Sequence, residues 1–404
     1  MAREGSVKNP RPQRGIGRAP LRQQREGEGC VEAVVSRNDV NPDCATLTVD
    51  VTAIVENWRS LAAKAPGAET AVSIKADAYG LGMFQIALAL ARAKAGTFFV
   101  ATLEEGIDLR RLRPDTTIYV LNGLGSGGIL KFLTHSLRPC LKSFDEVLAW
   151  SALGHGPAAL HIDTGMNRLG FGPDEVAALT ADRDPLERID VTLVMSHLAC
   201  AEERDNPMNA RQLAGFLAAV RQLGLEGKPL SIANSSGIFL GPDYHLQMTR
   251  PGAAIYGLNP LQNHPNPMRQ VIRLEGKILQ TRRVDTGMSV GYGATHLVGA
   301  PGRLATVGIG YADGFMRRLG NKGFAFIAGR RVPIVGRVSM DLTTLDVSAL
   351  PADLAKPGAV VEFLGPNQSP DDLAAAADTI GYEVLTALGR RYRRIYEAEG
   401  EARP

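Results

Sequence analysis

The sequence lacks the features that mark secreted, membrane-spanning or nucleic-acid-binding chains. Its 404 residues include only four cysteines without a CxxC pair, so neither a disulfide framework nor a metal site is expected, and a reducing, cytoplasmic location is the default. No apolar run reaches the roughly eighteen residues of a membrane span. The 45 Lys and Arg against 42 Asp and Glu are too balanced for a protein whose main partner is nucleic acid or anionic lipid. A composition that is 45% apolar predicts a globular protein with one or two domains.

The first 43 residues differ from the rest of the chain. Up to Glu28 they contain many basic residues and almost no apolar ones, so they cannot build a core. They also lack the apolar segment of a secretion signal. We therefore predict that 1–43 is a flexible basic tail, a solvated end rather than a nucleic-acid-binding arm.

Short β-branched runs alternate with amphipathic stretches, such as 84–95 and 210–223, between residues 44 and 262. A short strand at 47–49 is expected to lie outside this repeat. The eight strand candidates of the repeat are 71–77, 98–103, 117–122, 138–141, 159–164, 191–197, 230–235 and 248–256. This alternation predicts an α/β fold, a (β/α)8 TIM-type barrel, with its chemistry at the carboxyl ends of the strands. An open doubly wound sheet is the alternative, but the glycine fingerprint that it would need is missing.

The pattern changes after a segment rich in Pro and Asn at 259–268. We predict a mostly β C-terminal domain over 263–404, with a closing helix near 382–388. Its strand candidates are 271–280, 304–309, 324–327, 332–335, 343–347 and 359–364.

Polar and cationic residues lie at the predicted carboxyl ends of several barrel strands. Lys75 follows apolar residues in the first strand, and burial lowers the pKa of an ammonium and so favours the free amine that forms an imine with a carbonyl. Arg168 lies between two glycines after the fifth strand, where a guanidinium suits a carboxylate or phenolic oxygen. Taken alone, Lys75 could extend into solvent and Arg168 could pair with a surface acid.

The sixth and seventh strands end in His197 and Ser235, and the eighth contains Arg250. Small residues at the final two strands predict a phosphate cradle, although His197 by itself could be a core histidine. Together with Lys75 and Arg168 they predict a pyridoxal phosphate site. If Arg250 faces the pyridine nitrogen it can only donate a hydrogen bond, which leaves the ring unprotonated and favours proton exchange over transamination. The residues thus predict racemisation.

Nine motifs follow one another as they do in alanine racemases, and from about residue 45 to 396 the sequence resembles that family of fold type III pyridoxal phosphate enzymes. The motifs are KADAYGLG, HIDTGMNRLGF, MSHLACAE, NSSG, RPGAAIYG, VGYGAT, GYADG, VGRVSMD and TIGYEVLTALGRRYRR. The resemblance implies a barrel followed by a β domain, and interconversion of L- and D-alanine that supplies D-alanine for peptidoglycan. It further implies a homodimer in which the C-terminal domain contributes to the partner active site.

The resemblance also implies roles for single residues. Lys75 is similar to the lysine that holds the cofactor and acts as one acid/base, and Tyr292 resembles the opposing acid/base of the partner subunit, although a tyrosine in a Gly-Tyr-Gly turn would by itself be interpreted as buried core. A racemase needs both groups because a planar carbanion must be protonated from either face. The implied cofactor contacts are Lys75, Tyr79, Arg168, His197, Ser235, Arg250, Gly252, Ala253 and Tyr382, and the implied substrate contacts are Arg168, Tyr311, Met340 and Asp341.

One position departs from the family pattern. Many members have, seven residues before the arginine, a lysine that becomes carbamylated, whereas this chain has His161. An imidazole cannot supply the negative charge of a carbamate, so Arg168 must be oriented by a bound anion or another acidic residue. A racemase of broader specificity, for example for serine, stays open. A decarboxylase of the same fold is less favoured, because an acidic residue would then face the ring nitrogen in place of Arg250.

Overall fold

The computed structural model describes residues 45–113, 115–125, 128–152 and 156–398, all of which belong to one compact unit, Val40–Pro404. The predicted basic tail, 1–43, lies outside the described residues. Within those residues, no helix is long and apolar enough to cross a membrane.

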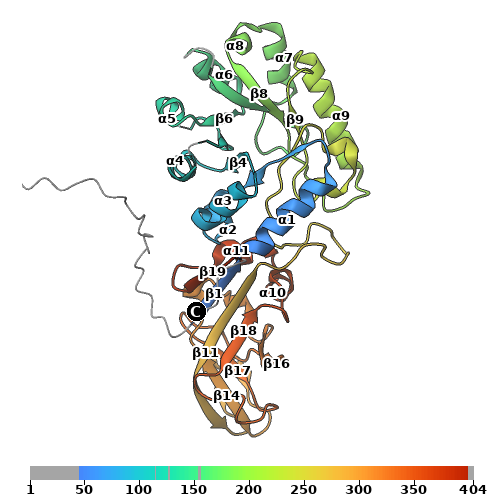
Figure 1. The fold of residues 1–404 in the computed structure, drawn as a ribbon. Helices are drawn as coiled ribbons and strands as arrows, with labels where there is room; N and C mark the ends of the chain where they lie inside the picture. Colours follow the sequence, from blue (N-terminus) through green and yellow to red (C-terminus); the bar gives the residue numbers. More distant parts are fainter. Residues whose placement is uncertain (1–44, 114, 126–127, 153–155, 399–404) are drawn as a thin grey trace, which may run out of the picture. The chain divides into compact units, whose positions relative to one another are not determined.

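A parallel sheet of seven strands, in the order of the sequence from β3 to β9, forms the first part of the fold. The helices that follow the strands lie on the outside of this sheet (Figure 1). The strands are β3 (Val72–Ser73), β4 (Thr97–Val100), β5 (Thr117–Val120), β6 (Arg138–Leu141), β7 (Pro157–His161), β8 (Asp190–Met195) and β9 (Leu230–Ser231). The helices are α3 (Met83–Arg92), α4 (Leu103–Leu112), α5 (Ile129–Thr134), α6 (Phe144–Ser151), α7 (Pro173–Ala181), α8 (Asp184–Glu187) and α9 (Pro207–Gln222).

Two short strands, β2 (Glu69–Thr70) and β10 (Met248–Thr249), close this sheet on itself. They pair in parallel with each other, and the hydrogen bonds continue beyond them because the Ser73 N–H donates to the Pro251 carbonyl at 2.9 Å. On the other side of β10, the Arg250 N–H donates to the Ala233 carbonyl at 2.9 Å, just beyond β9. The predicted (β/α)8 barrel class is therefore confirmed.

The inside of the barrel is filled by side chains. A buried cluster combines residues from β4 to β8 and β10 with Ala71, between β2 and β3, and within it the rings of Phe99 and Tyr119 stack with centroids 5.0 Å apart. All four residues of β4 are buried, as expected for a parallel strand covered on both faces. A packed interior leaves the rim at the carboxyl ends of the strands as the place for a ligand.

Helix α9 shows how local sequence positions a site segment. Asn206 caps its first turn by accepting the Met208 N–H at 3.0 Å, and Phe216 is buried on its inner face. Gln212, on the same face, is fully buried and donates to the His197 carbonyl at 2.9 Å. The helix thereby fixes the backbone that follows β8.

The first barrel strand is shorter than the predicted 71–77. It ends at Ser73, and Lys75 opens a turn, α2 (Lys75–Tyr79), in an unusual conformation. The four residues after Lys75 all have positive φ angles near +55°, the left-handed region: Ala76, Asp77, Ala78 and Tyr79. Each non-glycine residue in this region costs roughly 1–2 kcal/mol, so surrounding contacts must hold the turn.

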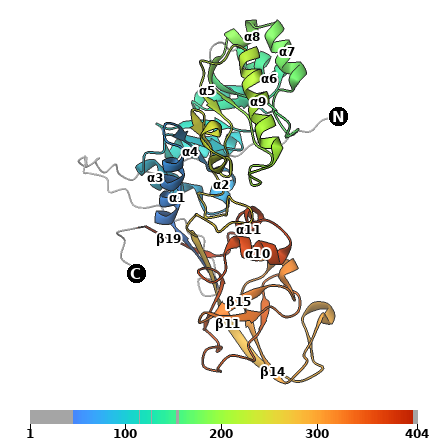
Figure 2. The same cartoon turned by 90° about the vertical axis from the view of Figure 1, so that its right-hand side faces the viewer.

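The second part of the fold is a mostly β region built around an eight-stranded sheet, as predicted. Its strands run in the order β16, β15, β18, β11, β1 and β19, with β14 paired to β11 and β17 paired to β14. The strands are β1 (Ala45–Asp50), β11 (Ile272–Val284), β14 (Gly302–Val307), β15 (Phe324–Ile327), β16 (Arg330–Pro333), β17 (Thr343–Asp346), β18 (Val360–Leu364) and β19 (Arg393–Glu397). Helices α10 (Pro370–Ala377) and α11 (Gly381–Ala387) lie together beside this sheet (Figure 2).

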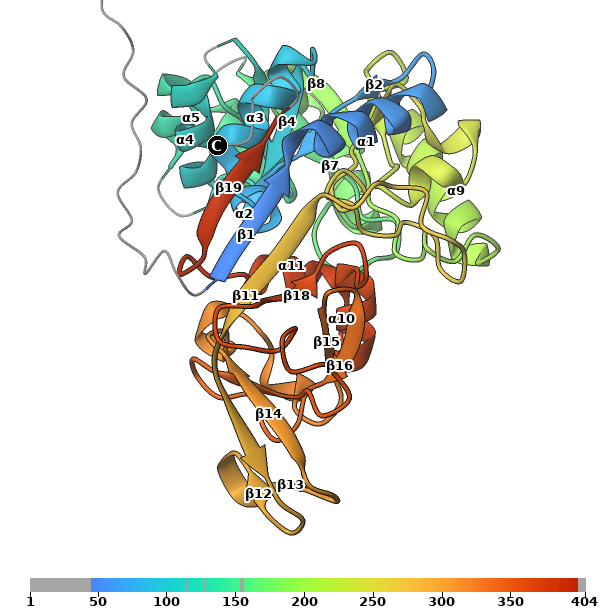
Figure 3. The ribbon, with the colours of Figure 1, turned by 60° about the horizontal axis from the view of Figure 1, so that its bottom comes forward.

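The first described strand of the chain belongs to this second sheet. β1 pairs antiparallel with β11 and parallel with β19, so segments from both ends of the described chain lie side by side (Figure 3). The prediction that 47–49 lies outside the barrel is confirmed. From β1, helix α1 (Val51–Lys64) leads into the barrel, with Asp50 capping it by accepting the Ala53 N–H at 2.8 Å.

A small hairpin extends the ribbon of β11 and β14. β12 (Ser289–Val290) and β13 (His296–Leu297) pair antiparallel at the far end of that ribbon (Figure 3). Between them lies the short turn η3 (Tyr292–Ala294). A second short turn, η4 (Tyr311–Asp313), follows β14.

Candidate active site

A cavity of about 560 Å³ opens at the carboxyl ends of the barrel strands. Its volume is within the range of sites that hold a cofactor or small ligand. It is lined by every residue of the predicted cofactor-binding set: Lys75, Tyr79, Arg168, His197, Ser235, Arg250, Gly252, Ala253 and Tyr382. Residues from distant parts of the sequence thus converge on one site.

Lys75 lies half-buried directly after the first barrel strand. Burial is the main cause of a lowered pKa for its ammonium, the Arg168 charge lowers the pKa further, and Glu105 opposes both. The Glu105 carboxylate also accepts the Ala76 N–H at 2.7 Å, so it holds the start of the turn that carries Lys75. The lowered pKa increases the fraction of free amine near neutral pH.

Arg250 is buried at the base of the cavity and is held by two groups. Its Nη2 donates to the Ser196 carbonyl at 2.6 Å, and its Nη1 donates to the Ser231 hydroxyl. Burial lowers the pKa of Arg250 to about 10, which still leaves the guanidinium charged at neutral pH. The site therefore has a fixed donor that does not give up its proton.

Two histidines face the same cavity, and both are neutral at pH 7. Burial, followed by the charges of Arg250 and Arg168, lowers the pKa of His197 well below its usual value. Burial, followed by Arg250, lowers the pKa of His161 to about 4. The His161 Nδ1 is buried without a hydrogen-bond partner among the described residues.

The part of the cavity lined by Ser235, Gly252 and Tyr79 has the features of an anion cradle. The Ser235 hydroxyl accepts the N–H groups of Gly252 at 3.0 Å and Ala254 at 3.1 Å. A Cβ on Gly252 would overlap the Tyr79 hydroxyl, so only glycine allows this approach. Burial raises the pKa of Tyr79 and keeps its phenol protonated. The centroid of the Tyr382 ring lies 6.2 Å from the centroid of the Tyr79 ring. The Ser235 hydroxyl, which still has its own hydrogen to donate, and the protonated Tyr79 phenol are donors that suit a phosphate.

Arg168 reaches the cavity from a turn after β7. The Asp163 carboxylate shapes the turn by accepting the N–H groups of Gly165 and Met166, each at 2.9 Å. Among the described residues the Arg168 guanidinium has no hydrogen bond or ion pair, so the alternative of a surface ion pair is not found. The neutral His161 nearby supplies no negative charge. Arg168 is therefore free to bind an anionic ligand.

Four predicted site residues lie elsewhere. Tyr292, Tyr311, Met340 and Asp341 do not line the cavity, and the first three are 72%, 42% and 54% exposed. The interpretation of Tyr292 as a buried core residue is wrong. The loops of Tyr311 and Met340 are joined, because the Tyr311 N–H donates to the Ser339 carbonyl at 3.0 Å. One chain thus presents a cavity and, separately, an exposed set of site residues.

Two family models together match most of the chain. The model described as alanine racemase, N-terminal domain, matches residues 49–260, and alanine racemase, C-terminal domain, matches 271–396. The chain belongs to the alanine racemase family. It is accordingly an enzyme that racemises alanine.

Relatives and solved structures agree with this family membership. The alanine racemase of Rhodospirillum rubrum is 51% identical over 87% of this chain and 96% of that protein, and a catabolic alanine racemase of Mesorhizobium japonicum is 47% identical over 87% and 93%. The Bartonella henselae alanine racemase with covalently bound pyridoxal phosphate has 38% identity and a TM-score of 0.85, covering 88% of this chain and all of that one. The biosynthetic enzyme of Pseudomonas aeruginosa has 34% identity and a TM-score of 0.81, covering 88% and 99%.

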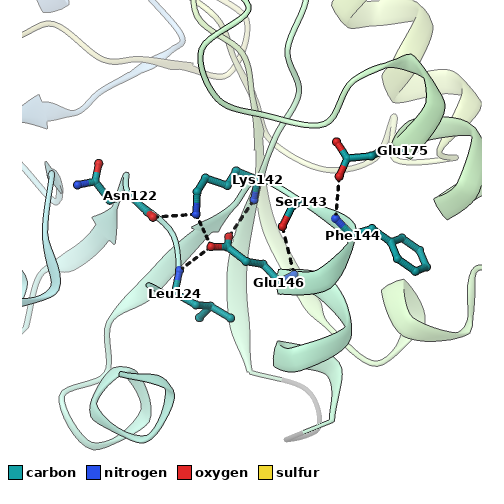
Figure 4. Close-up of polar contacts among 7 residues, drawn as sticks. All are labelled: Asn122, Leu124, Lys142, Ser143, Phe144, Glu146 and Glu175. Carbon is teal, nitrogen blue, oxygen red and sulfur yellow. Dashed lines mark hydrogen bonds and ion pairs between the residues drawn. The ribbon is translucent and has the colours of Figure 1, made fainter. Parts of the chain in front are cut away.

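Several polar residues that line the cavity were not predicted from the sequence, among them Asn122, just after β5. Its carbonyl accepts a hydrogen bond at 3.0 Å from Lys142, whose ammonium also pairs with the Glu146 carboxylate. Glu146 in turn accepts the N–H of Leu124, so a small polar network fixes this part of the rim (Figure 4). A polar residue at a strand's carboxyl end is the signal that identified the other strands, and it would have identified Asn122.

Proposed function

We propose that the enzyme interconverts L- and D-alanine with pyridoxal phosphate in the cavity and with proton carriers from two chains. Lys75 of one chain serves one face of the substrate, and Tyr292 of a second copy serves the other. The observation that supports this proposal is the separation of the two groups: Lys75 lines the cavity, whereas Tyr292 is 72% exposed on a distant hairpin. Inversion of a stereocentre needs a proton donor on each face.

The residues of the cavity fit pyridoxal phosphate. Lys75 has a lowered pKa and would hold the cofactor aldehyde, and the donors around Ser235 and Gly252 would hold its phosphate. Arg250, whose guanidinium stays charged at neutral pH, would donate to the pyridine nitrogen. When bound, pyridoxal phosphate acidifies the α-hydrogen of an amino acid. The covalently bound cofactor of the Bartonella henselae enzyme supports this assignment.

The chain's own groups then bind the substrate and move its proton. Arg168, which has no partner among the described side chains, would grip the substrate carboxylate with paired donors. In one direction the Lys75 amine removes the α-proton on its face and the Tyr292 phenol donates a proton on the other. In the reverse direction the Tyr292 phenolate removes the proton and the Lys75 ammonium donates one. His197 is neutral and so adds no further positive charge beside these groups.

A homodimer completes the site in this proposal. Tyr292, Tyr311 and Met340 are large side chains that a single chain leaves exposed, and all three lie in the C-terminal region. A two-fold arrangement would place these residues of each chain over the cavity of the other, which buries them and excludes water from the reaction. Asp341, in the same loop as Met340, would line the substrate pocket with it.

The cellular use we propose is the supply of D-alanine for peptidoglycan in the cytoplasm, with neither nucleic acid nor membrane as a partner. Relatives include enzymes named catabolic as well as one named biosynthetic, so this use needs its own test. The gene should restore growth, without added D-alanine, of a bacterial strain that lacks alanine racemase. Failure of the active enzyme to do so would favour the catabolic use.

The substitution Lys75→Ala tests the cofactor assignment. The purified wild-type protein should racemise alanine and, after borohydride reduction, yield a peptide with the cofactor attached to Lys75, detected by mass spectrometry. Lys75→Ala should lose both the attachment and the activity, whereas Lys356→Ala, an exposed control, should keep both. Retained racemase activity in Lys75→Ala would show that the assignment is wrong. Chiral chromatography on a panel of amino acids would show whether alanine is preferred over serine.

A further inference from the structure

The turn that carries Tyr292 has little in its own structure that would fix its conformation. Gly291 and Gly293 have φ angles of +69° and +74°, and Ala294 has +47°. The flanking strands β12 and β13 have only two residues each, and the Tyr292 ring is too exposed to be held by packing. The position of the phenol therefore depends on contacts from outside the hairpin.

Asn321 makes such contacts. Its Nδ2 donates to the Thr295 hydroxyl at 3.2 Å and to the Thr295 carbonyl at 3.4 Å, and Thr295 is the residue that ends the Tyr292 turn. Within the described part of the chain, no other side chain forms a hydrogen bond with residues 289–297. Asn321 itself has a φ of +61°, a left-handed conformation that asparagine tolerates better than most residues.

The same amide also holds the segment behind the turn. The Asn321 Oδ1 accepts the Gly336 N–H at 2.6 Å. Gly336 packs closely on the strand before Tyr292, since a Cβ there would lie 2.8 Å from the Val290 carbonyl oxygen. The next residue, Arg337, places its guanidinium 3.1 Å from where a Cβ of Gly293 would be. One side chain thus joins the end of the turn to its support.

We propose that Asn321 is a positioning residue for racemisation. It fixes the position and orientation that the Tyr292 phenol needs in the cavity of the second chain. The proposal rests on the proposed function, in which Tyr292 is the proton carrier on one face. A misplacement of about 1 Å can cost on the order of 100-fold in rate. Because Lys75 serves the other face independently, loss of Asn321 should weaken proton transfer on the Tyr292 face alone.

The test uses Asn321→Gly in the full-length holoenzyme. Glycine keeps the left-handed backbone and removes only the amide, so the fold should persist. Asn321→Asp is a milder variant that still accepts from Gly336 but cannot donate to Thr295. The matched control is Asn263→Gly, another asparagine with a φ of +59°, whose side chain has no hydrogen bond among the described residues.

Each enantiomer of alanine is incubated separately in D2O, and two rates are measured: α-hydrogen exchange by NMR and inversion by chiral chromatography. For Asn321→Gly we expect inversion to fall about 10- to 100-fold. One enantiomer, the one whose proton Lys75 removes, should continue to exchange with retention, so its ratio of exchange to inversion rises. Cofactor absorbance and dimer mass should match the Asn263→Gly control, and Asn321→Asp should change the ratio in the same direction.

An equal fall of exchange and inversion for both enantiomers, or rates equal to those of the Asn263→Gly control, would overturn the positioning role. Tyr292→Phe separates this failure from failure of the proposed function. If Tyr292→Phe racemises alanine as fast as the wild type, Tyr292 is not a proton carrier and both proposals are wrong. If Tyr292→Phe shows the asymmetric pattern and Asn321→Gly does not, only the role of Asn321 is wrong.

Discussion

At the scale of single residues, burial sets the charge of the cavity. Lys75, His161 and Arg250 all have lowered pKa values, and burial is the first cause in each case. Arg250 nevertheless keeps its charge at neutral pH, because its lowered pKa is still about 10. The cavity therefore combines guanidinium groups with two imidazoles that are neutral at pH 7 and an amine that loses its proton more readily than usual.

The neutral state of His161 predicts a loss of stability in acid. Its pKa falls from 6.5 in the unfolded chain to about 4 in the folded protein, so the unfolded chain binds more protons between these values. The free energy of unfolding should therefore decrease as the pH falls from 6.5 towards 4, by about 2 kcal/mol at pH 5 from this group. The charged or titratable groups that act on it are Arg250, Asp163, Arg168, Lys142 and His197.

His161→Gln is the variant that isolates this effect. Urea unfolding at pH 7 and pH 5 measures how much unfolding free energy is lost on acidification. This loss should be smaller for the variant than for the wild type by about 2 kcal/mol. An equal loss of unfolding free energy in the two proteins would mean that His161 is not the group responsible.

Residues at strand ends were predictable because their chemistry is local to the sequence. Lys75 follows an apolar run, Arg168 lies in the turn after the fifth strand and Arg250 lies in the eighth, and a barrel brings such positions to one rim. Tyr292 was not predictable in this way: nothing in its turn indicates exposure, and only the family resemblance assigned it a role. Its importance depends on a second chain, which no spacing within one sequence encodes.

At the scale of elements, the left-handed turn after Lys75 is the feature that most depends on its surroundings. Within it, the Gly80 N–H donates to the Ala76 carbonyl at 2.7 Å. Asp77 accepts the Met83 N–H at 2.7 Å at the start of α3, and the Leu385 carbonyl of α11 would overlap a Cβ on Gly80. Hydrogen bonds within the turn and to the start of α3, together with the close approach of α11 at Gly80, therefore hold four residues that would otherwise leave this region.

Substitutions of Ala76 test this strain. Ala76 is exposed and has a φ of +53°, so a new side chain there changes the backbone preference without a packing clash. Ala76→Gly should leave the free energy of unfolding within about 1 kcal/mol, because relief of strain offsets added chain entropy. Ala76→Val should lower it by about 2 kcal/mol, since β-branched residues avoid positive φ. Equal stability of the two variants in thermal unfolding would contradict the left-handed assignment.

The same turn explains where the sequence-based boundaries were inaccurate. The apolar run from Ala71 suggested a strand to residue 77, because consecutive left-handed alanines have no sequence signature. Strand β19 was missed for another reason: Arg393 and Arg394 make it polar, and its partner β1 lies at the other end of the chain. In contrast, β6 and β15 match their predicted limits, and β15 is a compact β-prone run between turn residues.

At the scale of the whole molecule, one chain holds the parts of two incomplete sites. The cavity has the cofactor-binding residues and Lys75, and the exposed hairpin has Tyr292. A symmetric pair of chains would complete both sites at once. This division is the central claim of the proposed mechanism, and it predicts that two different inactive variants can complement each other.

The most direct measurement is the activity of a hybrid dimer. Lys75→Ala and Tyr292→Phe chains with different affinity tags are co-expressed, and the hybrid is isolated by tandem purification. Each parent dimer should be nearly inactive, because every site lacks one proton carrier. The hybrid has one site with both wild-type groups and one with neither, so it should show about half of the wild-type activity per dimer. A hybrid as inactive as its parents would show that Lys75 and Tyr292 do not act across two chains.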